Sequence, residues 1–376
     1  MIINPFNRLI ESVLISILLT VNLAAQSPEW QGQLSSCLTI NPHPEFEGQI
    51  GVRYIPTISL QKQIDTYLID GEIAGNFYGI ANHNSTKDDD IDGKIKPYRL
   101  WIRFSSNQFE LRAGLQKINF GSATLLRPLM WFDRIDPRDP LQLTDGVYGI
   151  LSRYYFLNNA NIWLWGLLGN DETKGWEIYP STKNTPEFGG RLQIPLWTGE
   201  LALSAHHRKA VIEDNGRNSV PENRLALDGK WDVGVGIWSE AAISHKDHKE
   251  QSFRYTRMIN FGTDYTFDLG NGLHVLMEYL RVDASGEPFK SGKPASLLAL
   301  SMSYPMGLLD NLRAILYYDW VNENMYRFVN WQRTYDRWSF YVMGFWNPRE
   351  FEIYRNQDQE NLFAGKGLQF MVVFNH

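Results

Sequence analysis

The sequence predicts an all-β protein, a transmembrane, antiparallel, up-and-down β-barrel of about 16 strands, with 18 strands as the alternative. Three observations predict this class. Apolar and polar residues alternate along much of the chain, as expected for strands with one apolar face. The chain contains 13 Trp, 18 Tyr and 20 Phe, yet its mean hydropathy is only −0.33. Short and long links between the expected strands also follow one another in turn.

Composition excludes several other classes of protein. The 376 residues carry a formal net charge of −6, which argues against a nucleic-acid-binding protein with a basic face. The single cysteine, Cys37, rules out a disulfide within the chain and a zinc site built from several cysteines. Beyond residue 25, the sequence has no run of 18 apolar residues, so no membrane-spanning helix is predicted there.

Residues 1–25 are predicted to be a secretory signal peptide that is cleaved on export. Arg8 provides the positive n-region, and residues 13–21 form a mostly apolar run that is too short to span a bilayer as a helix. Residues 23–25 offer a small side chain at the cleavage point. The expected location is therefore the outer membrane of a Gram-negative-type bacterium.

Residues 26–63 are open to two interpretations. Trp30 to Ile40 and Phe46 to Leu60 could form an extra hairpin and bring the barrel to 18 strands. The same residues could instead form an N-terminal extension in the periplasm or a plug. The barrel itself is expected over residues 64–376.

The alternation assigns two faces to the predicted strands. In residues 98–104 the even positions, from Tyr98 to Phe104, are apolar, and in residues 108–116 the apolar set includes Leu111. The apolar face is expected to contact lipid, and the opposite face is expected to line the lumen. The predicted lumen-facing residues are Arg99, Arg103, Glu110, Arg112 and Gln116.

A soluble β-sandwich also alternates, but two features favour the membrane. Many alternating segments are about 9–11 residues or longer, the length that crosses a bilayer at a tilt. Tryptophans crowd the segment ends and would suit the interfacial girdles of an outer-membrane barrel; they are Trp163, Trp165, Trp320, Trp331, Trp338 and Trp346. The expected partners are outer-membrane lipid and a small hydrophilic solute, with no nucleic acid, and the oligomeric state stays open.

The expected links form two interleaved sets. Short links fall near residues 105–107, 158–159, 197–199, 232–234, 269–271, 305–310 and 334–336. The other links, mostly longer, fall near residues 83–95, 119–146, 170–187, 210–222, 246–250, 283–294, 322–323 and 347–366. Short periplasmic turns and longer outside loops produce this pattern.

The longest link, residues 121–145, combines charges with a nearly continuous apolar run from Leu125 to Phe132. Exposing such a patch to water would invite aggregation. We therefore expect this link to fold into the barrel and narrow the pore, where charged side chains set selectivity; the alternative is an outer loop that closes the barrel top. The predicted constriction residues are Arg127, Asp133, Arg134, Asp136, Arg138 and Asp139.

Residues 111–121, 127–128 and 133–140 resemble the central motif of alginate-export-type outer-membrane porins. They contain an R-x-G-x-Q strand from Arg112 to Gln116, the aromatic-Gly turn Phe120-Gly121, and an Asp- and Pro-rich loop from Asp133 to Pro140. The likeness is clearest over residues 99–150. It implies a many-stranded barrel that passes anionic saccharides or other small solutes.

No enzyme is predicted. Ser204 and His206 share one face of a strand, but a lipase on the outer wall would need this pair on the lipid side, which Leu203 occupies instead. Carboxylates at Asp133, Asp136 and Asp139, or in residues 88–92, could bind calcium. The sequence contains no phosphate loop, cysteine pair or helix-borne metal motif, so no metal and no cofactor is predicted.

Two functions remain. The first is a porin-like channel for passive passage of small hydrophilic solutes, with anionic saccharides as one candidate class. The second is a structural or binding barrel in the outer membrane with a closed lumen. The candidate inward positions carry both acidic and basic residues, which argues against strong anion selectivity.

Overall fold

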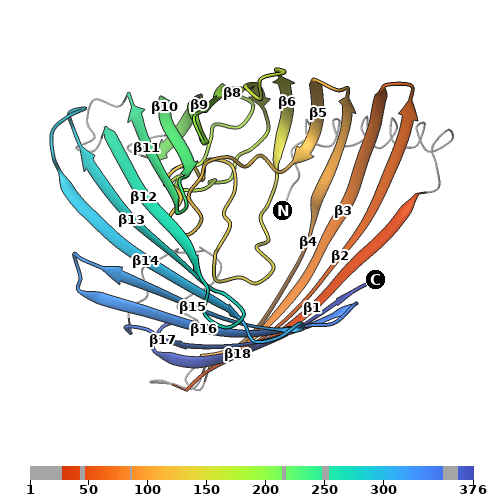
Figure 1. Cartoon of the computed structure of the whole chain (residues 1–376), viewed down its shortest axis with the longest axis vertical. Coiled ribbons are helices and arrows are strands. Elements are labelled where there is room, and N and C mark those ends of the chain that lie inside the picture. Colours follow the sequence, from red (N-terminus) through yellow and green to blue (C-terminus); the bar gives the residue numbers. More distant parts are fainter. Residues whose placement is uncertain (1–27, 43–46, 85–86, 214–216, 248–253, 350–362) are drawn as a thin grey trace.

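The structure, a computed structural model, describes residues 28–42, 47–84, 87–213, 217–247, 254–349 and 363–376. These residues form a closed barrel of 18 antiparallel strands (Figure 1). Each strand pairs with its neighbours in the sequence, and β1 also pairs with β18, which closes the sheet. The expected count of about 16 is therefore wrong, and the alternative of 18 is confirmed. The extra pair of strands is β1 and β2, in the N-terminal part of the chain.

The strands follow one another in chain order. The first nine are β1 (Glu29–Asn41), β2 (Glu47–Ile64), β3 (Tyr67–Asn84), β4 (Lys87–Ser105), β5 (Phe109–Gln116), β6 (Val147–Tyr155), β7 (Asn161–Leu167), β8 (Glu187–Leu196) and β9 (Gly199–Glu213). The others are β10 (Arg217–Asp232), β11 (Gly236–Lys246), β12 (Tyr255–Phe267), β13 (Leu273–Ser285), β14 (Lys293–Pro305), β15 (Asp310–Asp319), β16 (Asn324–Thr334), β17 (Trp338–Trp346) and β18 (Lys366–Asn375).

The longest links lie at one end of the barrel, the loop end, and join β5 to β6, β7 to β8 and β17 to β18. Two of the expected loops are wrong, because residues 83–95 and 210–222 lie mostly in strands β3, β4, β9 and β10. Backbone pairing does not require apolar side chains. The charged stretch at the start of β4 still alternates through Ile91 and Ile95, so the ladder continues through it.

The outer face of the barrel is largely apolar, whereas the inner face combines charged and polar residues with apolar clusters. Leu111, Leu225 and Ile259 are 39%, 49% and 41% exposed, as expected for side chains that face lipid. Their neighbours along the same strands, such as Glu110 and Asn260, are buried inside.

Tyr98 is an exception to the predicted alternation. The register between β3 and β4 shifts between Ala74 and Gly75, so that Arg99 pairs with Ala74 while Pro97 pairs with Gly75. This β-bulge turns Tyr98 inward, where it lines a cavity together with Lys96. Its predicted place on the lipid-facing side is therefore wrong.

The predicted tryptophan girdle is only partly correct. Trp320, Trp338 and Trp346 are 55%, 45% and 39% exposed on the outside of the barrel. Trp165 is buried instead, and its indole N–H donates to Nδ1 of His206 at 3.1 Å. Trp163 also packs inward, against a cluster that includes Phe120 and Trp131. The link between β5 and β6 supplies these inner apolar partners, so the lumen wall is a packed core there.

Introducing an arginine on the outer face should damage the barrel much more than introducing one inside. Leu111→Arg is expected to destabilise the protein by about 2–4 kcal/mol if position 111 lies near the bilayer midplane. Gln332→Arg, on the lumen face of β16, places the same charge toward water. Refolding into vesicles, followed by gels of unheated and boiled samples, measures both folded fractions. Equal yields for the two variants would mean that the faces are assigned wrongly.

Candidate functional site

The link between β5 and β6, residues 117–146, folds into the barrel; it is the yellow segment in the interior of Figure 1. We call it the inward segment. Leu125, Leu126 and Leu129 are at most 1% exposed. Leu125 and Leu126 pack against side chains of the inner wall that include Trp238 and Tyr317. Leu129 packs in a second cluster with Trp165. The segment and the wall thereby remove apolar surface from water.

Glu240 on β11 holds the first part of the inward segment. Its Oε1 accepts the backbone N–H groups of Ser122 at 2.5 Å and Ala123 at 2.7 Å, and its Oε2 accepts that of Leu129 at 3.2 Å. Gly121 permits this close approach, since it has φ +98° and a Cβ there would lie 2.5 Å from Oε1 of Glu240. Any larger residue at position 121 would displace the carboxylate.

Glu278 on β13 holds the apolar turn that follows. Its Oε1 accepts the N–H of Thr124 at 2.6 Å, and its Oε2 accepts those of Leu125 at 3.0 Å and Leu126 at 2.6 Å. The indole N–H of Trp238 donates to the same carboxylate at 3.2 Å. Buried backbone N–H groups need acceptors, and two wall carboxylates provide them for this irregular segment.

The predicted constriction residues interact mainly within the inward segment. Arg127 donates to Asp133 at 2.8 Å, and both side chains are buried. Arg138 forms an ion pair with Asp136 at 2.6 Å. Both pairs join residues of the same segment, so they stabilise its fold.

The remaining two constriction residues form hydrogen bonds with the links between β5 and β6 and between β7 and β8. Arg134 donates a hydrogen bond to the hydroxyl of Thr173. Asp139 accepts the backbone N–H groups of Leu141 at 2.9 Å and Leu143 at 3.3 Å. Burial raises the pKa of the Asp139 carboxyl above its ordinary value, against the lowering effect of these two hydrogen bonds.

The predicted lumen-facing residues form ion pairs and hydrogen bonds inside the barrel. Arg103 donates to Asp70 at 2.9 and 2.8 Å, and Arg112 donates to Glu110 at 3.1 Å. Glu110, the partner of Arg112, also lies 3.5 Å from Arg153. The other two bind backbone oxygens: Arg99 that of Thr144 at 3.1 Å, and Gln116 that of Gly149 at 3.0 Å.

A buried ionic network fills the lumen beside β8 to β11, and sequence reasoning missed it. It involves the link between β7 and β8, residues 168–186, which we call the second inward link. Within that link, Glu177 contacts Arg208 at 3.1 Å and Arg224 at 2.7 Å. Both arginines also contact Glu222, at 2.6 and 2.8 Å. The inward-facing charges were visible in the alternation, but no local pattern connects them to Glu177.

The second inward link also touches the inward segment directly. The indole N–H of Trp176 donates to the carbonyl oxygen of Arg127 at 2.7 Å. Gly175 has φ +49°, and a Cβ there would lie 1.6 Å from the carbonyl oxygen of Met130, so only glycine fits. The two links therefore pack as one unit over this half of the lumen.

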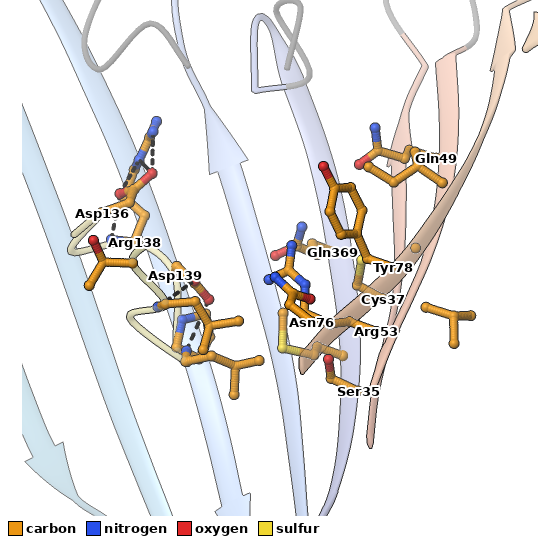
Figure 2. A pocket seen from close by; sticks show the side chains of 18 of the residues that line it. Ser35, Cys37, Gln49, Arg53, Asn76, Tyr78, Asp136, Arg138, Asp139 and Gln369 are labelled. Carbon is orange, nitrogen blue, oxygen red and sulfur yellow. Dashed lines mark hydrogen bonds and ion pairs between the residues drawn. The ribbon is translucent and has the colours of Figure 1, made fainter. Parts of the chain in front are cut away.

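A cavity of about 300 Å³ lies on the other side of the inward segment. Figure 2 shows Asp136, Arg138 and Asp139 on one side of this lumen cavity and the wall of the barrel on the other. The wall contributes side chains from β1 to β4 and β18, among them Cys37, Gln49, Arg53, Asn76, Tyr78, Lys96, Tyr98 and Gln369.

Two enclosed polar atoms of the cavity wall form no hydrogen bond within the described part of the chain. Arg53 lies over the ring of Tyr78 at 5.4 Å, and its Nε has no hydrogen-bond partner among the described residues. The same is true of Oδ1 of the buried Asn76. Lys96 is paired with Asp145 at 2.7 Å. The wall thus presents guanidinium, ammonium and amide side chains to the cavity.

The other candidate sites do not assemble in the described part of the chain. That part contains no group of three or more His, Cys, Asp or Glu side chains placed to hold a metal ion. In residues 88–92, Asp89 contacts His83 at 2.6 Å and Asp92 contacts Lys94 at 3.6 Å, while the side chain of Asp88 lies outside the described residues.

Ser204 and His206 both point inward, but each is bonded to other groups. Arg191 donates to the hydroxyl of Ser204 at 3.1 Å. The ring of His206 lies between Trp165, at 3.1 Å, and Glu187, at 3.2 Å. Both residues therefore belong to the packed interior.

No helix in the described ranges is both long enough and apolar enough to span a membrane.

No protein-family model matches the chain, and no curated protein matches its sequence. Solved structures match in fold. The crystal structure of OccAB4 from Acinetobacter baumannii gives a TM-score of 0.55 at 8% identity, covering 94% of this chain and 98% of its own. OccK7 (OpdD) of Pseudomonas aeruginosa gives 0.53 at 9% identity, covering 93% and 98%. OmpT, an outer membrane protein of Vibrio cholerae, gives 0.51 at 10% identity, covering 93% and 99%. The chain therefore has the porin-like β-barrel fold of outer-membrane proteins.

Proposed function

We propose that this protein is a passive channel for small hydrophilic solutes in the outer membrane, reached after cleavage of a signal peptide at residues 1–25, which lie outside the described part of the chain. The observation that carries the proposal is the lumen cavity between the inward segment and the wall of β1 to β4. It is lined by charged and amide side chains, which replace part of a solute's hydration shell.

The six predicted constriction residues divide into two groups in this proposal. Arg134, Asp136, Arg138 and Asp139 line the cavity and act on the solute directly. Arg127 and Asp133 form a buried pair behind them and hold the segment in place.

Anionic saccharides are the finer candidate for the solute. Arg53 and Lys96 on the wall suit an anionic group, and the amides of Asn76, Gln49 and Gln369 suit hydroxyl groups. The resemblance of residues 99–150 to alginate-export-type porins points the same way. The acidic residues of the inward segment oppose strong anion selectivity, so we expect only a moderate preference.

A closed barrel with a structural or binding role is the second candidate function. The observation that favours it is the buried network around Arg208 and Glu177, which blocks passage beside β8 to β11. The two functions differ in one property, because only the channel conducts ions through the cavity beside Cys37.

The native cysteine allows a direct test. Cys37 faces the lumen cavity and is the only cysteine in the chain. Treating the protein in a planar bilayer with a bulky, water-soluble methanethiosulfonate reagent is expected to lower single-channel conductance, because the adduct occupies the passage. Cys37→Ser should conduct normally, and the reagent should leave its conductance unchanged.

Two results would contradict the channel proposal. One is a folded, inserted barrel that passes no current, which supports the closed alternative. The other is an unchanged conductance after mass spectrometry has shown complete modification of Cys37, which would place the passage elsewhere in the lumen.

A further inference from the structure

A row of aromatic and polar side chains crosses the outside of the barrel from β8 to β12. The strand register pairs Phe188 with His207, His207 with Asn223, Asn223 with His245, and His245 with Tyr255. The ring centroids of Phe188 and His207 lie 5.0 Å apart, and those of His245 and Tyr255 lie 4.4 Å apart. We call these five residues the outer polar row.

The outer polar row lies at the edge of the lipid-facing apolar surface. On β9 and β10, His207 and Asn223 share a face with Leu203 and Leu225, which are 48% and 49% exposed. On both strands the polar residue is the one nearer the loop end of the barrel. An apolar outer surface that ends in polar residues marks the boundary between hydrocarbon and headgroups.

A hollow of about 380 Å³ opens on the outer surface at this boundary. The small outward side chain of Ala205 leaves room for it, and Leu225 and Ile243 are among its apolar lining. His207 and His245 lie in the same lining. A space with apolar walls and polar groups beside it suits an amphiphile with an acyl chain and a polar headgroup.

Cations adjoin the hollow on the same side of the sheet. Ile243 pairs with Arg257, which donates to Asp283 at 2.7 Å. Arg281 lies 3.8 Å from the same carboxylate, and its side chain is 49% exposed. Nε of Arg257 has no hydrogen-bond partner among the described residues. One carboxylate thus faces two guanidinium groups, and the half-exposed Arg281 is open to an anionic ligand.

We propose that this surface binds a lipid with a phosphate-bearing headgroup. The acyl chain occupies the hollow between Ala205, Leu225 and Ile243. The phosphate accepts hydrogen bonds from Arg257 and Arg281, which compensates the excess positive charge. Arginines at the edge of the hydrocarbon extend toward anionic headgroups in this way. The occupant is a lipid and not free phosphate, because the hollow offers apolar contact that inorganic phosphate cannot use.

The test measures which lipid stays bound to the full-length protein. Protein reconstituted in phosphatidylcholine nanodiscs with a minor fraction of phosphatidic acid is released into detergent, and native mass spectrometry counts the retained lipids. Wild type should retain phosphatidic acid in preference to phosphatidylcholine. Each of Arg257→Gln and Arg281→Gln should weaken this preference about 5-fold, and excess inorganic phosphate should leave it unchanged.

Two further variants make the result specific. Arg327→Gln removes an outward arginine on β16, across the barrel, and should leave lipid retention as in wild type. His207→Leu with His245→Leu alters the lining of the hollow and keeps both arginines, so it should weaken retention even if the arginine variants fold poorly. Gels of unheated and boiled samples identify the folded fraction.

Four results would overturn the proposal. They are equal retention of the two lipids by wild type, equal loss in the Arg327→Gln control, displacement of the lipid by inorganic phosphate, and a dimer in which a second copy covers the outer polar row. Channel conductance is a separate measurement, so failure here leaves the proposed function untouched.

Discussion

Replacing Glu278 with alanine is expected to raise single-channel conductance several-fold. Glu278 accepts three backbone N–H groups, from Thr124, Leu125 and Leu126, at 2.6–3.0 Å. Each buried N–H left without an acceptor costs about 1–3 kcal/mol, so three cost roughly 3–9 kcal/mol. We expect this cost to be larger than the free energy that holds the inward segment in its position. We therefore expect the inward segment to leave its position and the lumen to widen.

The strand wall should survive this change, because its ladder does not depend on the segment. Glu278→Ala should still migrate differently before and after boiling, while protease added from the loop end should cut residues 121–145. Deletion of residues 125–140 should give a similarly wide channel. Glu278→Gln keeps one amide oxygen and should give an intermediate conductance.

Glu72→Ala is the matched control. It removes one lumen carboxylate from β3, far along the sheet from β13, and should leave the inward segment in place. Its conductance should stay close to that of wild type. If the two alanine variants conduct alike, the contacts of Glu278 do not hold the segment and only the lumen charge matters.

The sequence was most informative where a local rule applied. Alternation separated Leu111 from Glu110 correctly, since a strand turns successive side chains to opposite faces. The inward position of the longest link followed from its apolar run, Leu125 to Phe132, which had to be buried somewhere. Both inferences need only a strand period and the free energy of exposing apolar surface.

Prediction failed where the partner is distant in the chain. Nothing near Glu240 or Glu278 indicates that their carboxylates bind backbone groups more than a hundred residues away. Only the folded geometry of the inward segment decides which of its arginines pairs with which aspartate. The bulge that turns Tyr98 inward likewise depends on pairing between two strands.

Arg127 and Arg53 are expected to respond differently to the same substitution. Arg127→Gln leaves Asp133 as an unpaired charge in a buried site, and breaking such a pair costs about 3–5 kcal/mol. The inward segment should lose its fixed position, and conductance should rise and become noisy. Arg53 lies over the ring of Tyr78 in the wall of the lumen cavity. Arg53→Gln removes this cation and breaks no ion pair between described residues.

Reversal potentials in a salt gradient separate these two effects. Arg53→Gln should keep a quiet current of nearly wild-type size and shift selectivity toward cations, because the cavity loses one positive charge. Arg127→Gln together with Asp133→Asn removes both charges and should recover part of the wild-type conductance, since neither side chain then leaves a buried charge unpaired. A selectivity shift in Arg127→Gln as large as that in Arg53→Gln, with unchanged conductance, would mean that Arg127 faces the solute. The distinction follows from burial: a charge that the solute meets sets the field in the pore, whereas a charge enclosed with its partner sets the shape of the segment that bounds it.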